Sequence, residues 1–135
     1  MPQSTPGAAA RPLSPHLQVW RWHLTLVCSI AHRATGMALY GGFVLLAGWA
    51  VALAAGPVVY DVYTGILGSL VGKVVLFGLT LSALYHLAAG IRHLVWDAGH
   101  GFEPRTAEFT GAICLAFAVV GAIGVFVIAH LMGAL

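Results

Sequence analysis

The stretch Tyr85-His86-Leu87-Ala88-Ala89-Gly90-Ile91-Arg92-His93-Leu94-Val95-Trp96-Asp97 closes a long apolar run with two histidines, an arginine and an aspartate. His86, Gly90, His93 and Asp97 recur at helical spacing, so a helix over this stretch would carry them on one face. Ionisable groups inside an apolar span are costly, and a histidine there needs a reason. This pattern of side chains predicts a helix that binds a flat and bulky group.

The composition indicates an all-α integral membrane protein. Of the 135 residues, 60% are hydrophobic and 7% are charged, and the mean hydropathy is +0.93. Soluble domains carry about 25% charged residues, so this chain has too few to cover a surface facing water. The small and scattered net charge of +2 gives no support for a nucleic-acid partner. Cys28 and Cys114 stand in apolar segments without a CxxC motif, which favours small core residues over zinc or covalent haem.

Three apolar segments are long enough to cross a bilayer as helices. They cover residues 24–56, 65–96 and 109–132. Gly56-Pro57 ends the first segment, and we expect residues 58–64 to form a short connection.

The N-terminal region divides into two parts. Residues 1–13 are rich in Pro, Ala and Ser and are expected to form a disordered tail, which leaves residues 14–135 as one membrane-anchor domain. Ser14-Pro15 fits a helix start, and the tryptophans beside Arg21 are typical of a segment at headgroup level. We therefore expect a short interfacial helix before the first span.

The distribution of arginine predicts the orientation in the membrane. Arg11, Arg21 and Arg33 lie in or before the start of the first span, and Arg92 and Arg105 flank the second loop. The positive-inside rule then places the N-terminus in the cytoplasm and the C-terminus on the periplasmic side. Because the first two spans are antiparallel, Arg33 and Arg92 would lie at the same membrane surface.

His86 is the residue most suited to bind a cofactor. It could simply form a hydrogen bond to a neighbouring helix, but a neutral imidazole in a span is also a good axial ligand for haem iron. Gly90, one turn later, leaves room for a porphyrin edge, while Arg92 and His93 lie toward the surface where propionates need partners. No other histidine is deep enough on the same side, so the second axial ligand is expected from another chain.

A second group of polar residues lies near the start of the first span. Ser29 and Arg33 are one helical turn apart and could donate hydrogen bonds to a carbonyl oxygen or a haem propionate. Alternatively, Arg33 extends to the lipid phosphates. His32 points about 100° away from Arg33 on the helix.

These motifs resemble a known family. The patterns are Arg11-Pro12-Leu13-Ser14-Pro15-His16-Leu17, then Ser29-x-x-His32-Arg33-x-Thr35-Gly36, then His86-x-x-x-Gly90-x-Arg92-His93-x-x-x-Asp97. Together they resemble the cytochrome b large membrane-anchor subunit of succinate dehydrogenase, respiratory complex II. The resemblance covers nearly the whole chain.

The resemblance implies specific roles for residues. One haem b would be held between two membrane subunits, with His86 as this chain's axial ligand. Ser29 and Arg33 match positions at the ubiquinone site. Positions near the haem propionates are matched by His32, Arg92 and His93.

The resemblance also implies a complex. The partners would be a flavoprotein that oxidises succinate, an iron-sulfur subunit and a small membrane-anchor subunit, and this chain alone would not be active. The family branch is alphaproteobacterial or mitochondrial, and a bacterial inner membrane is the expected location. The alternatives are the anchor of a quinol:fumarate reductase and a haem-free membrane scaffold.

Overall fold

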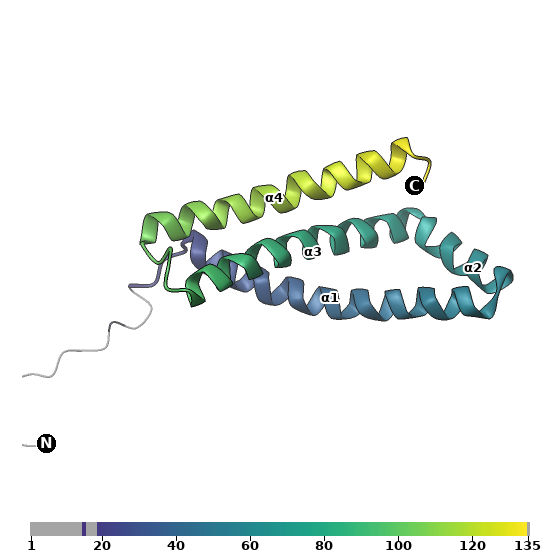
Figure 1. The fold of residues 1–135 in the computed structure, drawn as a ribbon, viewed down its shortest axis with the longest axis horizontal. Coiled ribbons are helices and arrows are strands. Elements are labelled where there is room, and N and C mark those ends of the chain that lie inside the picture. Colours follow the sequence, from purple (N-terminus) through teal and green to yellow (C-terminus); the bar gives the residue numbers. More distant parts are fainter. Residues whose placement is uncertain (1–14, 16–18, 135) are drawn as a thin grey trace, which may run out of the picture.

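The computed structural model describes residue 15 and residues 19–134. The elements in that part of the chain are four helices: α1 (Leu24–Ala55), α2 (Pro57–Gly68), α3 (Leu70–Asp97) and α4 (Pro104–Leu131). α1, α3 and α4 run along the length of the molecule, and α2 joins α1 to α3 at one end (Figure 1). These three long helices are long and apolar enough to cross a membrane. The prediction of an all-α membrane fold with three spans is confirmed.

The prediction of a short connection at residues 58–64 is wrong, because these residues form most of α2. Gly56 has φ +101°, a conformation that suits glycine, and Pro57 then occupies the first position of the new helix. α2 folds back on α1, where the hydroxyl of Tyr63 donates to the Leu45 carbonyl at 2.6 Å. The polar residues of the expected connection therefore lie on a helix: Tyr60, Asp61 and Tyr63, of which Tyr63 is bonded to α1.

α3 consequently begins later than residue 65, the expected start of the second span. Ser69 interrupts the helix, and its hydroxyl accepts a hydrogen bond from the Gly72 amide at 3.1 Å, which caps α3. α4 begins earlier than residue 109, because Pro104 supplies a favourable first helical position. The earlier start of α4 leaves a loop of only six residues, 98–103, between α3 and α4.

The N-terminal expectations fall largely outside the described residues. The tail at residues 1–13 and Ser14 lie outside them. Residues 20–23 are not helical, so the part of the interfacial helix expected there is wrong. Instead, Nδ1 of His23 accepts a hydrogen bond from the Leu26 amide at 3.2 Å and caps α1.

Small side chains allow α4 to approach the other helices closely. Its buried positions recur every three or four residues: Ala107, Gly111, Cys114, Ala118 and Ala122. Such stripes let helix backbones come together in a membrane, where packing rather than water exclusion drives association. Both cysteines are buried and free, as expected of small core residues.

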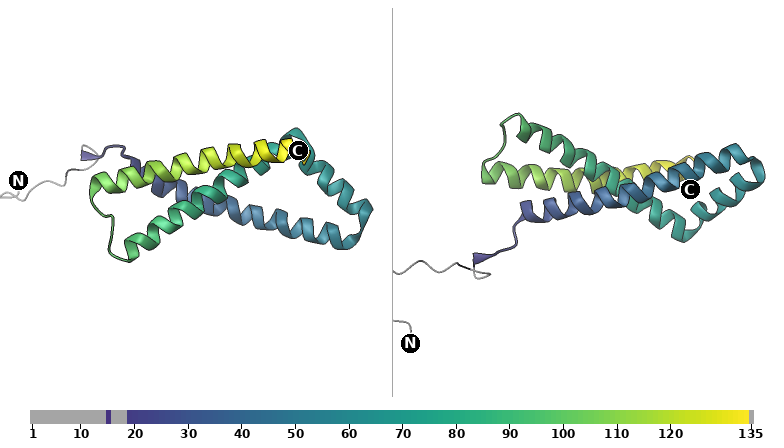
Figure 2. Two further views of the ribbon diagram at one scale, coloured as in Figure 1. Left: turned by 45° about the horizontal axis from the view of Figure 1, so that its top comes forward. Right: turned by 90° about the horizontal axis from the view of Figure 1, so that it is seen from below.

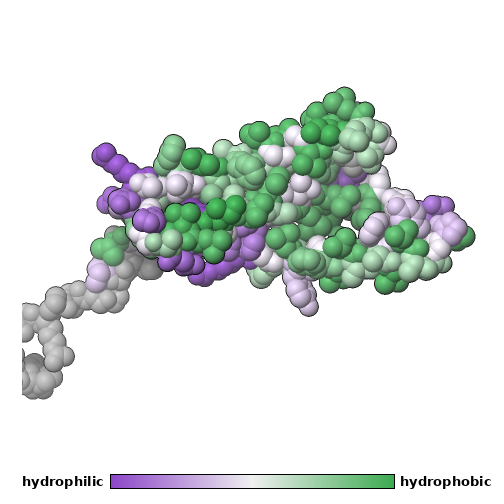
Figure 3. All heavy atoms as spheres, viewed as in Figure 1, coloured by the Kyte–Doolittle hydropathy of each residue, from purple (hydrophilic) through white to green (hydrophobic). Residues whose placement is uncertain are grey.

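The outer surface of the helices is mainly apolar. Figure 2 shows α3 crossing α1, so each helix keeps much of its length uncovered by this chain. Figure 3 shows hydrophobic residues over the middle of the molecule and hydrophilic ones gathered toward its ends. Large side chains of α1 such as Met37, Tyr40 and Phe43 are 70–77% exposed. This surface is suited to lipid or to another apolar protein.

We expect Gly111→Ala to destabilise the helix packing by about 1–3 kcal/mol, the usual effect of overfilling a core. An added Cβ at this position would lie 2.9 Å from Sγ of Cys28. Gly124→Ala, also in α4, is the matched control, because a Cβ there meets nothing within 4 Å. Thermal unfolding of the purified protein in detergent should show a lower midpoint for the first variant only. Equal midpoints would contradict the close approach of α1 and α4.

Candidate functional site

Three histidines gather where α1 faces α3. His32 of α1 stacks on His86 of α3, with ring centroids 4.0 Å apart and planes 10° apart. His93, two turns further along α3, meets the His32 ring edge-on at 4.9 Å. The structure thus brings together His32, His86 and His93, the three histidines predicted to lie at a haem.

The tautomer of His86 follows from its hydrogen bonds. Its Nδ1 lies 3.2 Å from the His32 carbonyl oxygen and 3.3 Å from Oγ1 of Thr35. A carbonyl oxygen can only accept, so Nδ1 must carry the proton and donate it. In the neutral imidazole, Nε2 of His86 is then unprotonated and keeps a free lone pair. A metal-binding imidazole needs this state.

Two further features leave room and binding capacity beside His86. A Cβ added to Gly90, one turn later on α3, would meet nothing within 4 Å. Nε2 of His32 is buried and has no hydrogen-bond partner within the described part of the chain. Buried polar atoms are nearly always paired in native proteins. The two features fit a bulky group with acceptor atoms beside the histidines.

Arg92 lies on a different side of α3 from His86. It is only 8% exposed, and its Nη2 donates to the Ala107 carbonyl at 2.7 Å while its Nε donates to Oγ1 of Thr110 at 3.0 Å. Its guanidinium carbon also lies 3.9 Å from the ring centroid of Trp96. These contacts engage Arg92 with α4 and not with the histidines.

Ser29 and Arg33 lie on α1 at the margin of the histidine cluster. Ser29 is half-buried and Arg33 is exposed. Because the neighbouring His32 ring faces α3, Arg33 does not turn into the bundle formed by this chain. The two residues therefore border a part of α1 that a further group could contact.

Sequence reasoning missed the role of Thr35 and Gly36, which appeared only as letters of a motif. Thr35 contacts His86 as described above, and a Cβ on Gly36 would lie 3.2 Å from Cε1 of the same ring. Their positions three and four residues after His32 place them on its helix face. This spacing could have predicted that Thr35 and Gly36 share a helix face with His32. It could not predict their contact with His86, because the sequence does not show that His32 faces α3.

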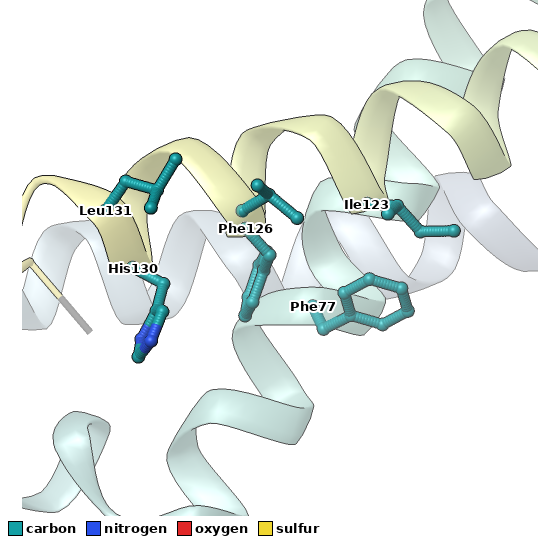
Figure 4. A pocket seen from close by; sticks show the side chains of 6 residues that line it. Phe77, Ile123, Phe126, His130 and Leu131 are labelled. Atoms are coloured by element: carbon teal, nitrogen blue, oxygen red, sulfur yellow. The ribbon is translucent and has the colours of Figure 1, made fainter.

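A separate hollow of about 360 Å³ lies near the C-terminal end of α4 (Figure 4). Its lining is Phe77, Ile123, Phe126, Val127, His130 and Leu131. Phe77 precedes His86 by nine residues, or roughly 13 Å along α3. His130 is thus the polar side chain of an apolar hollow and does not join the histidine cluster.

The fold and the histidine cluster define a class of protein: a membrane protein with three spans and a histidine cluster between α1 and α3. Residues 8–125 match the family described as succinate dehydrogenase/fumarate reductase transmembrane subunit, so the chain belongs to that family.

Several relatives support this membership. The chain is 42% identical over 113 residues to the succinate dehydrogenase cytochrome b556 subunit of Paracoccus denitrificans, covering 84% of this chain and 87% of the relative. It is 36% identical over 119 residues to the mitochondrial cytochrome b560 subunit of Sus scrofa, covering 84% and 69%. The cytochrome b556 subunit of Rickettsia felis is 36% identical over 102 residues, covering 75% and 78%.

These findings confirm the family predicted from the sequence motifs. The chain is a membrane-anchor subunit of an oxidoreductase complex, and it crosses an inner membrane several times.

The contact between Arg92 and α4 can be tested with a double-mutant cycle. We expect Arg92→Met and Thr110→Val to be coupled by about 1–2 kcal/mol in thermal stability, because each removes one side of the same hydrogen bond. Arg105→Met is the control arginine, since Arg105 is exposed. Its effect should add to that of Thr110→Val. Additivity in the Arg92 cycle would show that this hydrogen bond is not made.

Proposed function

We propose that this chain binds one haem b through Nε2 of His86 and forms part of a ubiquinone-reduction site with Ser29 and Arg33. The observation that carries the haem assignment is the hydrogen bond from Nδ1 of His86 to the His32 carbonyl, which leaves Nε2 free to bind iron. The names of the relatives, cytochrome b556 and cytochrome b560 subunits, support a haem of this type.

The residues around His86 fit a haem. The open space beside Gly90 would accommodate the porphyrin edge. The unpaired Nε2 of His32 and the ring of His93 would offer hydrogen bonds to the propionates. Arg92, bonded to α4, would act there mainly by holding α3 in place. When bound, the haem supplies a centre that gains and loses one electron reversibly.

The second axial ligand would come from a small membrane-anchor subunit. His130 lines the distant apolar hollow, and His100 is in the exposed loop between α3 and α4, so neither lies near His86. A flavoprotein and an iron-sulfur subunit would complete the complex and deliver electrons from succinate. The end of the bundle that carries Arg33 would then face the cytoplasm, in agreement with the arginine distribution.

Ser29 and Arg33 would serve the quinone. A quinone that takes two electrons must also take two protons, and negative charge develops on its oxygens before the protons arrive. The hydroxyl of Ser29 would donate a hydrogen bond to one carbonyl oxygen. The exposed guanidinium of Arg33, one turn away, would stabilise the developing charge.

The direction of the reaction would be succinate oxidation. The family description covers both succinate dehydrogenases and fumarate reductases, but the relatives at 36–42% identity are named succinate dehydrogenase subunits. A haem-free scaffold is less favoured, because it gives no reason for an imidazole held with a free Nε2 in an apolar bundle.

His86→Ala should remove or strongly alter the low-spin b-type haem spectrum of the purified complex, because the iron loses its ligand from this chain. His100→Ala is the control, since His100 is exposed in the loop after α3. The measurement is the reduced-minus-oxidised absorption spectrum together with haem content. An unchanged spectrum in the His86 variant would contradict the proposal that His86 binds the haem iron.

Arg33→Leu should lower succinate-dependent ubiquinone reduction by about 100-fold, since one charge-stabilising donor is lost. Turnover with an artificial acceptor that takes electrons before the quinone should stay normal. Arg21→Leu, an exposed arginine that precedes α1, serves as the control. Normal quinone reduction in the Arg33 variant would refute this part of the proposal.

A further inference from the structure

We infer that Thr35 and Gly36 of α1 are positioning residues for the His86 imidazole. The Thr35 hydroxyl accepts a share of the Nδ1 proton of His86, and the absence of a side chain at Gly36 leaves space for the ring. Through them, α1 would adjust how strongly His86 binds iron. This inference rests on the proposed haem-binding role of His86.

The first step concerns the proton of the Thr35 hydroxyl. Oγ1 lies 2.8 Å from the Ala31 carbonyl oxygen and 3.0 Å from the His32 carbonyl oxygen, and both can only accept. The single hydroxyl proton is therefore directed into α1. The lone pairs of Oγ1 remain for Nδ1–H of His86 at 3.3 Å.

The Nδ1 proton of His86 is consequently shared between two acceptors of α1, Oγ1 of Thr35 and the carbonyl of His32. The carbonyl belongs to the backbone and cannot be changed by substitution. The Thr35 hydroxyl is the adjustable part of this pair. The hydrogen bonds from the hydroxyl to the Ala31 and His32 carbonyls hold this oxygen in position.

Gly36 leaves the space that the His86 ring occupies. A Cβ at this position would lie 3.2 Å from Cε1 of His86, closer than an ordinary van der Waals contact. Stacking with His32 at 4.0 Å limits movement of the ring on one face. Any side chain at position 36 would thus push the imidazole out of the orientation that its hydrogen bonds define.

The hydrogen bond has a consequence for the iron. An acceptor on Nδ1–H raises the electron density on the opposite ring nitrogen and makes it a stronger ligand. A stronger imidazole donor stabilises ferric iron more than ferrous iron, so the midpoint potential falls. Removing the Thr35 hydroxyl should therefore raise the potential of the haem.

Thr35→Val tests the hydroxyl, because valine keeps the branched shape and removes the acceptor. In the complete complex, optical redox titration should show a higher haem midpoint potential. The expected change in the relative affinity for ferric over ferrous haem is up to about tenfold, or about 59 mV for one electron. Thr35→Ser, which keeps the hydroxyl, should restore a potential close to that of the parent protein.

Gly36→Ala tests the steric condition, with Gly41→Ala in the same helix as the control. A Cβ on Gly41 would meet nothing within 4 Å. Low-temperature electron paramagnetic resonance of the ferric haem reports the orientation of its axial imidazoles. The signal should shift in the Gly36 variant and remain unchanged in the Gly41 variant.

The outcomes separate this inference from the haem assignment. A complex without haem, or one whose spectrum survives His86→Ala, overturns the proposed function itself. If His86 is the ligand but the Thr35→Val potential and the Gly36→Ala signal equal those of the parent, the positioning role is wrong. Haem loss in Thr35→Val with retention in Thr35→Ser supports the hydroxyl. Haem loss in both variants would assign Thr35 to packing and overturn its proposed role.

Discussion

Two backbone carbonyls of α1 fix the position of α3, and the rest of the site depends on them. The hydroxyl of Tyr85 donates to the Cys28 carbonyl at 2.9 Å, and the next residue, His86, donates to the His32 carbonyl at 3.2 Å. The acceptors are one helical turn apart, and each has a second lone pair beyond its helical bond. Water does not compete for such bonds inside a bilayer. Adjacent residues of α3 are thereby tied to a single face of α1.

The opposite side of α3 is bound to α4 by different means. Arg92 donates to the Ala107 carbonyl and to Thr110, and small residues such as Gly111 let the helices approach. A buried guanidinium requires such partners, because an unpaired charge in an apolar environment is strongly unfavourable. α3 is thus held on two sides by polar contacts. One of its faces can then present His86 at a defined position while the other is occupied by packing.

The sequence predicted the parts of this structure that depend on local patterns. Long apolar segments gave three spans, and the motif spacing singled out His32, His86 and His93, which do lie together. It did not predict α2, because Asp61 and two tyrosines resemble a polar loop until Tyr63 is seen to bond to α1. Helical spacing already places Arg92 about 120° from His86 around α3. Its partners, Ala107 and Thr110, depend on where α4 packs, and no local pattern contains that information.

The contacts of His86 also bear on how a complex of this kind would assemble. Its ring is oriented by α1, through contacts of Nδ1 with the His32 carbonyl and the Thr35 hydroxyl, a stacked His32 and the space at Gly36. The proposed ligand atom is therefore in place before any partner binds, so the entropy of ordering the ring is already lost. The haem proposed to bridge two chains would stabilise their association by mass action, because it would bind the assembled state best. A preorganised histidine on this chain would let the cofactor bind here first and recruit the second subunit.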